Sequence, residues 1–163
     1  MNTLFKNIFK PGKIGNLRLK NRLIMSVFPA GFATDSQVSE QMLEFYRARA
    51  RGGVALIVVE SPSLNYPFDY KGGHQFRLDE DQFLPGLNKF LRALHQEEAK
   101  VFVQLSYPAN DQDGNNLAKT LTPLAIQGLI RRFVFGAKQA RHAGFDGAEI
   151  QTAYGGLLSR FLS

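Results

Sequence analysis

The chain has 163 residues, of which 44% are hydrophobic and 21% are charged. This composition is typical of one soluble globular domain and excludes a disordered chain. It contains no cysteine, which excludes disulfides and thiolate chemistry and agrees with a cytoplasmic protein. The net charge of +6 allows attraction of anionic ligands. It does not predict nucleic-acid binding, because Arg47, Arg49 and Arg51 share a predicted helix with Glu40 and Glu44, as on a solvated face.

No membrane contact is expected from the sequence. No run approaches the roughly 20 apolar residues that a membrane span requires. Residues 1–13 carry charges among their apolar residues, so they do not form the continuous apolar region of a signal peptide.

The first part of the chain predicts a hairpin, a strand and a helix. Residues 14–19 alternate around Gly15 and Asn16, which is typical of a small β-hairpin. Residues 23–25 form a short apolar strand that ends before Pro29. Ser39 is placed to cap a helix over residues 40–51, whose inward stripe is Leu43, Tyr46 and Ala50.

The middle of the chain predicts two further strands around a second helix. Residues 54–59 are the clearest strand, and they lead into a long loop at residues 61–84. Pro85 fits the first turn of a helix that reaches about residue 97, with Leu87, Leu91 and Leu94 on one face. The third strand covers residues 101–105.

The last part predicts the longest helix and a fourth strand. A polar loop at residues 109–119 precedes Thr122 as the N-cap, and Gly144 ends the helix. Apolar residues at helical spacing predict its buried stripe: Ile126, Leu129, Ile130, Phe133, Val134, Ala137 and Ala140. The fourth strand, residues 148–150, runs into a glycine-rich turn and a short helix.

Repeating βα units predict an α/β fold with parallel strands. Two architectures remain open at this point, an open doubly wound sheet and a segment of a (β/α)8 TIM barrel. No G-x-G-x-x-G sequence follows the first strand, which favours the barrel over a dinucleotide-binding sheet. In either architecture ligands lie where parallel strands end at their carboxyl termini.

Four segments of the chain form a recognisable pattern, namely residues 19–25, 47–60, 103–105 and 143–150. Together they resemble the old yellow enzyme family, and within it the NADH:flavin oxidoreductase and 2,4-dienoyl-CoA reductase branch. The resemblance implies that residues 1–163 are the N-terminal half of an FMN-binding TIM barrel, with about four of its βα units. It also implies FMN as cofactor, NAD(P)H as reductant and hydride transfer to an activated alkene such as an enone or enoyl compound.

The resemblance also assigns roles to individual positions. The segment Ser26, Val27, Phe28 and Pro29 matches the loop along the flavin ring, Ser61 matches a small residue touching the flavin, and Gln104 matches the glutamine at the pyrimidine edge. A carboxamide suits that edge because it can donate and accept hydrogen bonds at once.

The catalytic positions depart from the family pattern. The family has His-x-x-His or His-x-x-Asn and then Tyr after the fourth strand, where this chain has Gln151, Tyr154 and Gly156. Gln151 and Tyr154 are still able to donate hydrogen bonds to a substrate oxygen. Gly156 has no proton to deliver. Pro29 presents no hydroxyl or thiol, and Tyr107 stands where the branch commonly has His.

The other polar features are interpreted as structural. The histidines His74, His95 and His142 match no catalytic position and lack metal-ligand spacing. Residues 79–81 are expected to form a solvated acidic turn, and Asp146 is expected to be structural.

Two other functions remain open beside the oxidoreductase. A four-stranded piece has two apolar sheet edges and lacks the phosphate site that barrels build after strands seven and eight, which predicts an inactive half-barrel that self-associates. The third alternative is a different barrel or a small ligand-binding module without flavin.

Overall fold

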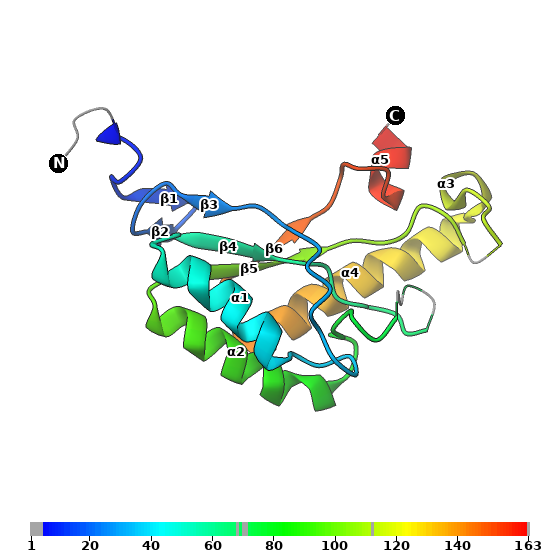
Figure 1. Ribbon diagram of the computed structural model, residues 1–163. Helices are drawn as coiled ribbons and strands as arrows, with labels where there is room; N and C mark the ends of the chain where they lie inside the picture. Colours follow the sequence, from blue (N-terminus) through cyan, green and yellow to red (C-terminus); the bar gives the residue numbers. More distant parts are fainter. Residues whose placement is uncertain (1–4, 68, 70–71, 112, 163) are drawn as a thin grey trace.

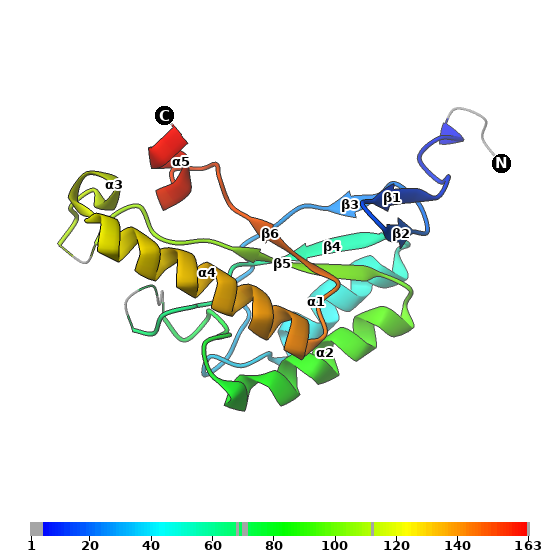
Figure 2. The same ribbon diagram turned by 180° about the vertical axis from the view of Figure 1, so that it is seen from behind.

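The computed structural model describes residues 5–67, 69, 72–111 and 113–162. It contains a two-stranded hairpin and a four-stranded sheet with helices on one face (Figures 1 and 2). The hairpin pairs β1 (Gly12–Ile14) with β2 (Leu17–Leu19) in antiparallel register. This confirms the turn that Gly15 and Asn16 predict, and Gly15 has the positive φ of 53° that favours glycine.

The main sheet is parallel throughout and its strands lie in chain order. Its members are β3 (Ile24–Met25), β4 (Leu56–Val59), β5 (Lys100–Leu105) and β6 (Gly147–Ile150). The strand assignments from sequence are thus confirmed to within two residues at each end. Because all strands run in one direction, their carboxyl ends meet at one edge of the sheet.

Three helices cover one face of this sheet (Figure 1). They are α1 (Glu40–Arg51), α2 (Leu84–Gln96) and α4 (Pro123–Ala143), and a short 3₁₀ helix, Asp81–Phe83, precedes α2. The predicted caps are confirmed: Ser39 accepts a hydrogen bond from the Met42 amide, and Thr122 accepts one from the Ala125 amide. The core lies between these helices and the sheet, and its largest members are Tyr46, Phe76, Phe90 and Leu94.

The buried stripe predicted for α4 is partly wrong. Ile130 is 58% exposed and Val134 is also exposed, whereas Gly136, Gln139, Ala140 and Ala143 are buried. The helix turns small residues towards the core, and at Gly136 it closely approaches Leu64 of the loop after β4, where a Cβ atom would lie 2.8 Å from Leu64 Cδ2. Its larger apolar side chains therefore lie outside this contact.

Two short helices complete the fold. The loop predicted at residues 109–119 contains the start of α3 (Leu117–Thr120), which Asn116 caps by accepting a hydrogen bond from the Ala118 amide. The chain continues after β6 into α5 (Leu157–Leu162), as the sequence predicts. Both helices lie near the carboxyl ends of the strands (Figure 2).

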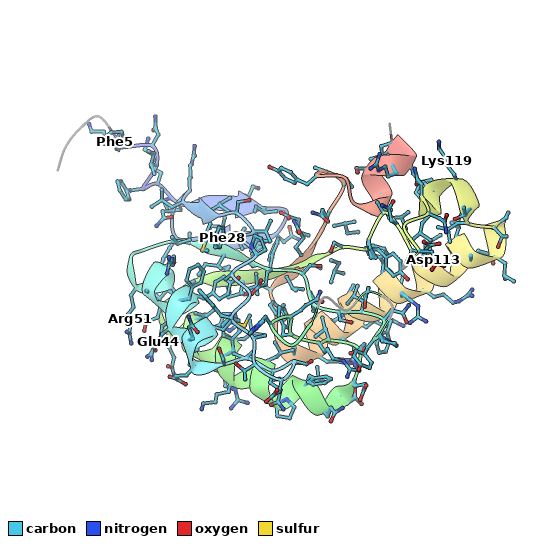
Figure 3. The ribbon with its side chains drawn as sticks, turned by 45° about the vertical axis from the view of Figure 1, so that its right-hand side comes forward. Phe5, Phe28, Glu44, Arg51, Asp113 and Lys119 are labelled. Atoms are coloured by element: carbon cyan, nitrogen blue, oxygen red, sulfur yellow. The ribbon has the colours of Figure 1, made fainter. Side chains whose placement is uncertain are left out.

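The charged residues of α1 form ion pairs at the protein surface. Arg47 Nε and Arg51 Nε each lie 3.1 Å from Glu97 Oε1, and Arg51 also pairs with Glu44. Figure 3 shows Glu44 and Arg51 close together on the outer side of α1. This confirms the solvated, ion-paired helix face expected from the sequence.

The acidic turn at residues 79–81 is more ordered than expected. Asp79 pairs with Arg77 at 2.9 Å, Glu80 also pairs with Arg77, and Asp81 accepts a hydrogen bond from Gln139 Nε2 at 2.8 Å. The turn therefore joins the long loop to α4. Within the described part of the chain, no helix is long and apolar enough to cross a membrane.

Candidate active site

A cleft of about 530 Å³ opens at the carboxyl edge of the parallel sheet. Its volume lies within the roughly 300–1,000 Å³ of typical cofactor sites. Each of the four strands contributes to it through the residues at or just after its end. The lining residues are Ser26, Val27, Pro29, Gly31, Glu60, Ser61, His74, Gln75, Gln104, Ser106, Gln151 and Tyr154.

The structure gathers the residues singled out in the sequence into this one cleft, with Phe28 as the exception. The ring of Phe28 is exposed and stacks on Phe45 of α1, with 6.2 Å between ring centroids. Figure 3 places Phe28 above α1. Phe28 therefore packs on the helical layer and does not line the cleft.

Gln104 is held in one orientation on the floor of the cleft. It lies opposite Glu149 in the sheet register and donates from Nε2 to Glu149 Oε1 at 2.7 Å. A carboxylate can only accept hydrogen bonds, so it fixes the amide nitrogen on its own side. Gln104 is 6% exposed, and its carbonyl oxygen is the group left to accept a bond from a ligand N–H.

Two serine hydroxyls join the ends of β4 and β5. Ser61 Oγ lies 2.6 Å from Ser106 Oγ, and Gln75 Nε2 donates to the Ser61 carbonyl at 3.0 Å. These bonds hold the long loop after β4 against the neighbouring strand end. Ser106, Gln75 and His74 were not assigned to the site from sequence. Ser106 directly follows β5, and that position at a strand end was the signal that could have identified it, whereas Gln75 and His74 reach the cleft only through the folding of the long loop.

Glu60 is another site residue that sequence reasoning missed. It follows β4 directly, is 6% exposed and accepts a hydrogen bond at Oε2 from the Gly31 amide at 3.1 Å. Burial raises the pKa of Glu60, while the backbone N–H groups of Gly31 and Ala30 act to lower it. A charged residue at the end of a buried strand was the signal that could have identified it.

The predicted substrate-binding residues differ in how firmly they are placed. Gln151 extends the β6 pairing, since its amide donates to the Leu105 carbonyl at 2.9 Å, and its side chain lines the cleft. Tyr154 is 94% exposed, with a positive φ of 56° in the turn before α5. Its hydroxyl therefore belongs to the mouth of the cleft.

The cleft suits the uncharged ring of a flavin better than its phosphate. Serine hydroxyls, carboxamides and apolar side chains line it, and the described lining residues include no lysine or arginine. Phosphate groups bind where basic side chains or helix N-termini meet them. The described residues also contain no group of three metal-binding side chains.

A sequence model of the NADH:flavin oxidoreductase / NADH oxidase family matches residues 7–120 and 107–163. The chain belongs to this family. The match covers the four strands and every residue of the cleft described above, which confirms the resemblance noted in the sequence.

Family members in the curated proteins extend well beyond the length of this chain. The chain is 34% identical to an NADH oxidase of Thermoanaerobacter brockii, with 99% of the chain and 28% of the relative covered. It is 36% identical to a metal reductase of Desulforamulus reducens, with 96% and 26% covered. The chain thus spans about a quarter of the length of these relatives.

Solved structures of family members share the fold. The old yellow enzyme from Trypanosoma cruzi superposes with a TM-score of 0.79 at 26% identity, over 96% of this chain and 54% of the enzyme. A 2-naphthoyl-CoA reductase superposes with a TM-score of 0.83 at 23% identity, over 98% and 29%, which bears on the fold alone. The chain is therefore an α/β partial TIM barrel.

Proposed function

We propose that this chain supplies the N-terminal half of the active site of an NAD(P)H-dependent FMN oxidoreductase of the ene-reductase type. The observation that carries the proposal is the cleft at the carboxyl edge of the sheet, where Gln104 presents a fixed carbonyl oxygen beside Ser61 and the segment from Ser26 to Pro29. The Thermoanaerobacter relative is an NADH oxidase, which supports NADH as the reductant.

These residues would hold the flavin ring by its polar edge and one face. Gln104 would accept a hydrogen bond from the ring imide, and Ser61 with the 26–29 segment would form the apolar and hydroxyl-bearing wall. When bound, FMN supplies the two-electron carrier that takes hydride from NAD(P)H and passes it to an activated alkene.

The substrate side of the cleft would use Gln151 and Tyr154 as hydrogen-bond donors. A donor close to the carbonyl-type oxygen of an enone stabilises the negative charge that develops there during hydride transfer. Gly156 supplies no acid, so the proton for the alkene carbon would come from another donor, such as solvent. We therefore expect slow reduction of the alkene, because proton delivery from solvent is less efficient than from a positioned acid. The rate at which NAD(P)H reduces the flavin should be normal, because that step does not need the proton.

The test is the colour and reactivity of the full-length protein that contains this chain. We expect it to purify yellow and to lose its absorbance near 450 nm when NADH or NADPH is added without oxygen. The Gln104→Leu variant should bind FMN at least tenfold more weakly, because the ring imide then loses a buried partner. A folded but colourless protein that takes up no added FMN would refute the proposal.

A second candidate is an inactive half-barrel that self-associates. The exposed apolar residues on the two outer strands, Ile24 and Ile150, favour it, as does a cleft without basic residues. This candidate predicts a folded protein that neither binds FMN nor oxidises NADH. A cytoplasmic location is part of either proposal and is supported by the absence of cysteine.

A further inference from the structure

Glu60 is a buried acid whose hydrogen bonds lead to the wall of the cleft. Its side chain reaches from the end of β4 to the segment after β3, where Oε2 accepts from the Gly31 amide at 3.1 Å. The Ala30 amide donates instead to the Phe28 carbonyl at 2.9 Å. Gly31 comes two residues after Pro29, so one carboxyl group restrains the end of the segment from Ser26 to Gly31.

The other side of Glu60 is tied to the helical layer. Its backbone N–H donates to the hydroxyl of Tyr46 at 3.3 Å, and Tyr46 is fully buried in α1. The phenol ring packs in turn on Phe45 and Phe90. Glu60 therefore rests on a rigid part of the core, and the segment it holds lies at the edge of the sheet.

The second carboxyl oxygen identifies this arrangement as more than ordinary packing. Glu60 Oε1 is buried and has no hydrogen-bond partner among the described residues. A buried polar atom without a partner lowers the stability of the fold. Buried polar groups kept at this cost occur most often at functional sites, and Glu60 lines the candidate active site.

We propose that Glu60 is a positioning residue of the cleft, which fixes the 26–31 segment at the distance from β4 and β5 that a bound flavin ring requires. It does so by accepting a hydrogen bond from the Gly31 backbone amide. The inference rests on the proposed function for the identity of the ligand, but the restraint on the segment stands on the geometry alone. Glu60 affects the reaction only through the position of the 26–31 segment and takes part in no chemical step itself.

Two substitutions separate this role from simple packing. Glu60→Gln keeps a carbonyl oxygen that can accept from the Gly31 amide, whereas Glu60→Leu keeps a side chain of similar length and removes the acceptor. Glu98→Gln is the matched control, since Glu98 is exposed and precedes β5 at the opposite edge of the sheet. All variants are made in the full-length protein.

The first measurement is hydrogen exchange of the backbone amides, which requires no ligand. In Glu60→Leu we expect the Gly31 amide to exchange roughly tenfold faster, while amides of α2 and β5 keep their wild-type rates. Glu60→Gln should restore most of the protection. Unchanged exchange at Gly31 in Glu60→Leu would overturn the proposal, as would equal loss of protection in both variants.

The second measurement is FMN affinity, followed by quenching of flavin fluorescence. We expect Glu60→Leu to weaken binding about tenfold and Glu60→Gln to remain within about threefold of the wild type. If wild-type protein binds no FMN while the exchange results hold, the proposed function fails and the positioning role stands. If FMN binds equally to wild type and Glu60→Leu, the positioning of a flavin wall is refuted.

Discussion

Gly156 shows at the scale of one residue why the site departs from its family pattern. A Cβ atom at this position would lie 3.1 Å from Gln151 Oε1 and 3.6 Å from the Tyr107 carbonyl. The first distance is shorter than most contacts of a Cβ atom. A side chain at 156 would therefore require the end of the Gln151 side chain to shift by a few tenths of an ångström, so the missing side chain at 156 and the position of Gln151 are structurally linked.

Gly147 is a second residue whose missing side chain has a structural reason. A Cβ there would lie 2.5 Å from Cε1 of Phe102, its register partner on β5. Glycine within a strand commonly marks such a close approach. The ring of Phe102 covers the start of β6 as a result.

We therefore expect Gly147→Ala to destabilise the fold by about 1–3 kcal/mol, because the ring must move to admit the methyl group. Urea unfolding followed by circular dichroism measures the change. Adding Phe102→Leu should recover part of the loss, since the smaller side chain leaves room. Gly86→Ala serves as a packing control because a Cβ at Gly86 would have no neighbouring atom within 4 Å and its φ is not in the left-handed region. Equal stability of Gly147→Ala and wild type would contradict this explanation.

Asp146 joins three elements at the amino-terminal ends of the strands, which lie opposite the cleft. It accepts hydrogen bonds from His95 of α2 at 2.8 Å, from Lys100 of β5 at 3.0 Å and from the Val101 amide at 2.9 Å. Burial acts to raise its pKa, but the Val101 amide and the two side chains outweigh it and lower the pKa. The structural role expected for Asp146 from sequence agrees with these contacts.

Asp146→Asn should reduce the free energy of unfolding by about 1–2 kcal/mol at pH 7, since hydrogen bonds to a charged group are stronger than neutral ones. A carboxyl group with a lowered folded-state pKa stabilises the protein above its unfolded value of about 3.8, and that contribution disappears as pH falls through the folded-state pKa.

The difference between Asp146→Asn and wild type should therefore be full above about pH 5 and should close towards pH 3. Urea unfolding at several pH values measures it. The exposed Asp113, which lies beside α3 in Figure 3, gives the control Asp113→Asn. A difference that stays constant from pH 7 to pH 3 would show that the charge of Asp146 does not stabilise the fold.

At the scale of the whole molecule, the four-stranded sheet has an open edge on each side within the described residues. The outer strands β3 and β6 each pair on one side within the described chain, and Ile24 and Ile150 on them are 52% and 53% exposed. Parallel strands with exposed apolar residues and unpaired backbone groups promote pairing with another chain. In relatives about four times as long, further sequence is available to cover such edges.

The 163-residue chain expressed alone is therefore predicted to self-associate through these edges. Sedimentation velocity should show species larger than the 18.2 kDa monomer that increase with concentration. The double variant Ile24→Lys with Ile150→Lys should shift the distribution towards monomer, because edge lysines oppose strand pairing. Leu124→Lys changes an exposed apolar residue on α4 and should leave the distribution unchanged. A stable monomer at all concentrations would disprove the prediction.

The sequence by itself determined the elements, the family and most of the cleft. Ser39, Thr122 and Gly144 act on neighbouring residues, through capping hydrogen bonds and a left-handed turn. The sequence alone therefore predicts the helix ends that they form. The parallel βα repeat then places every strand end at one edge, which brings Gln104 and Gln151 together without knowledge of the packing.

The tertiary structure decided the features that depend on distant neighbours. The buried face of α4 includes Gly136, which closely approaches Leu64 in the loop after β4, whereas the apolar pattern alone favoured another face that includes the exposed Ile130. His74 and Gln75 enter the cleft only because a long loop folds back over β4. Glu60 was missed for the same reason, since its importance lies in a bond to Gly31, 29 residues earlier in the chain.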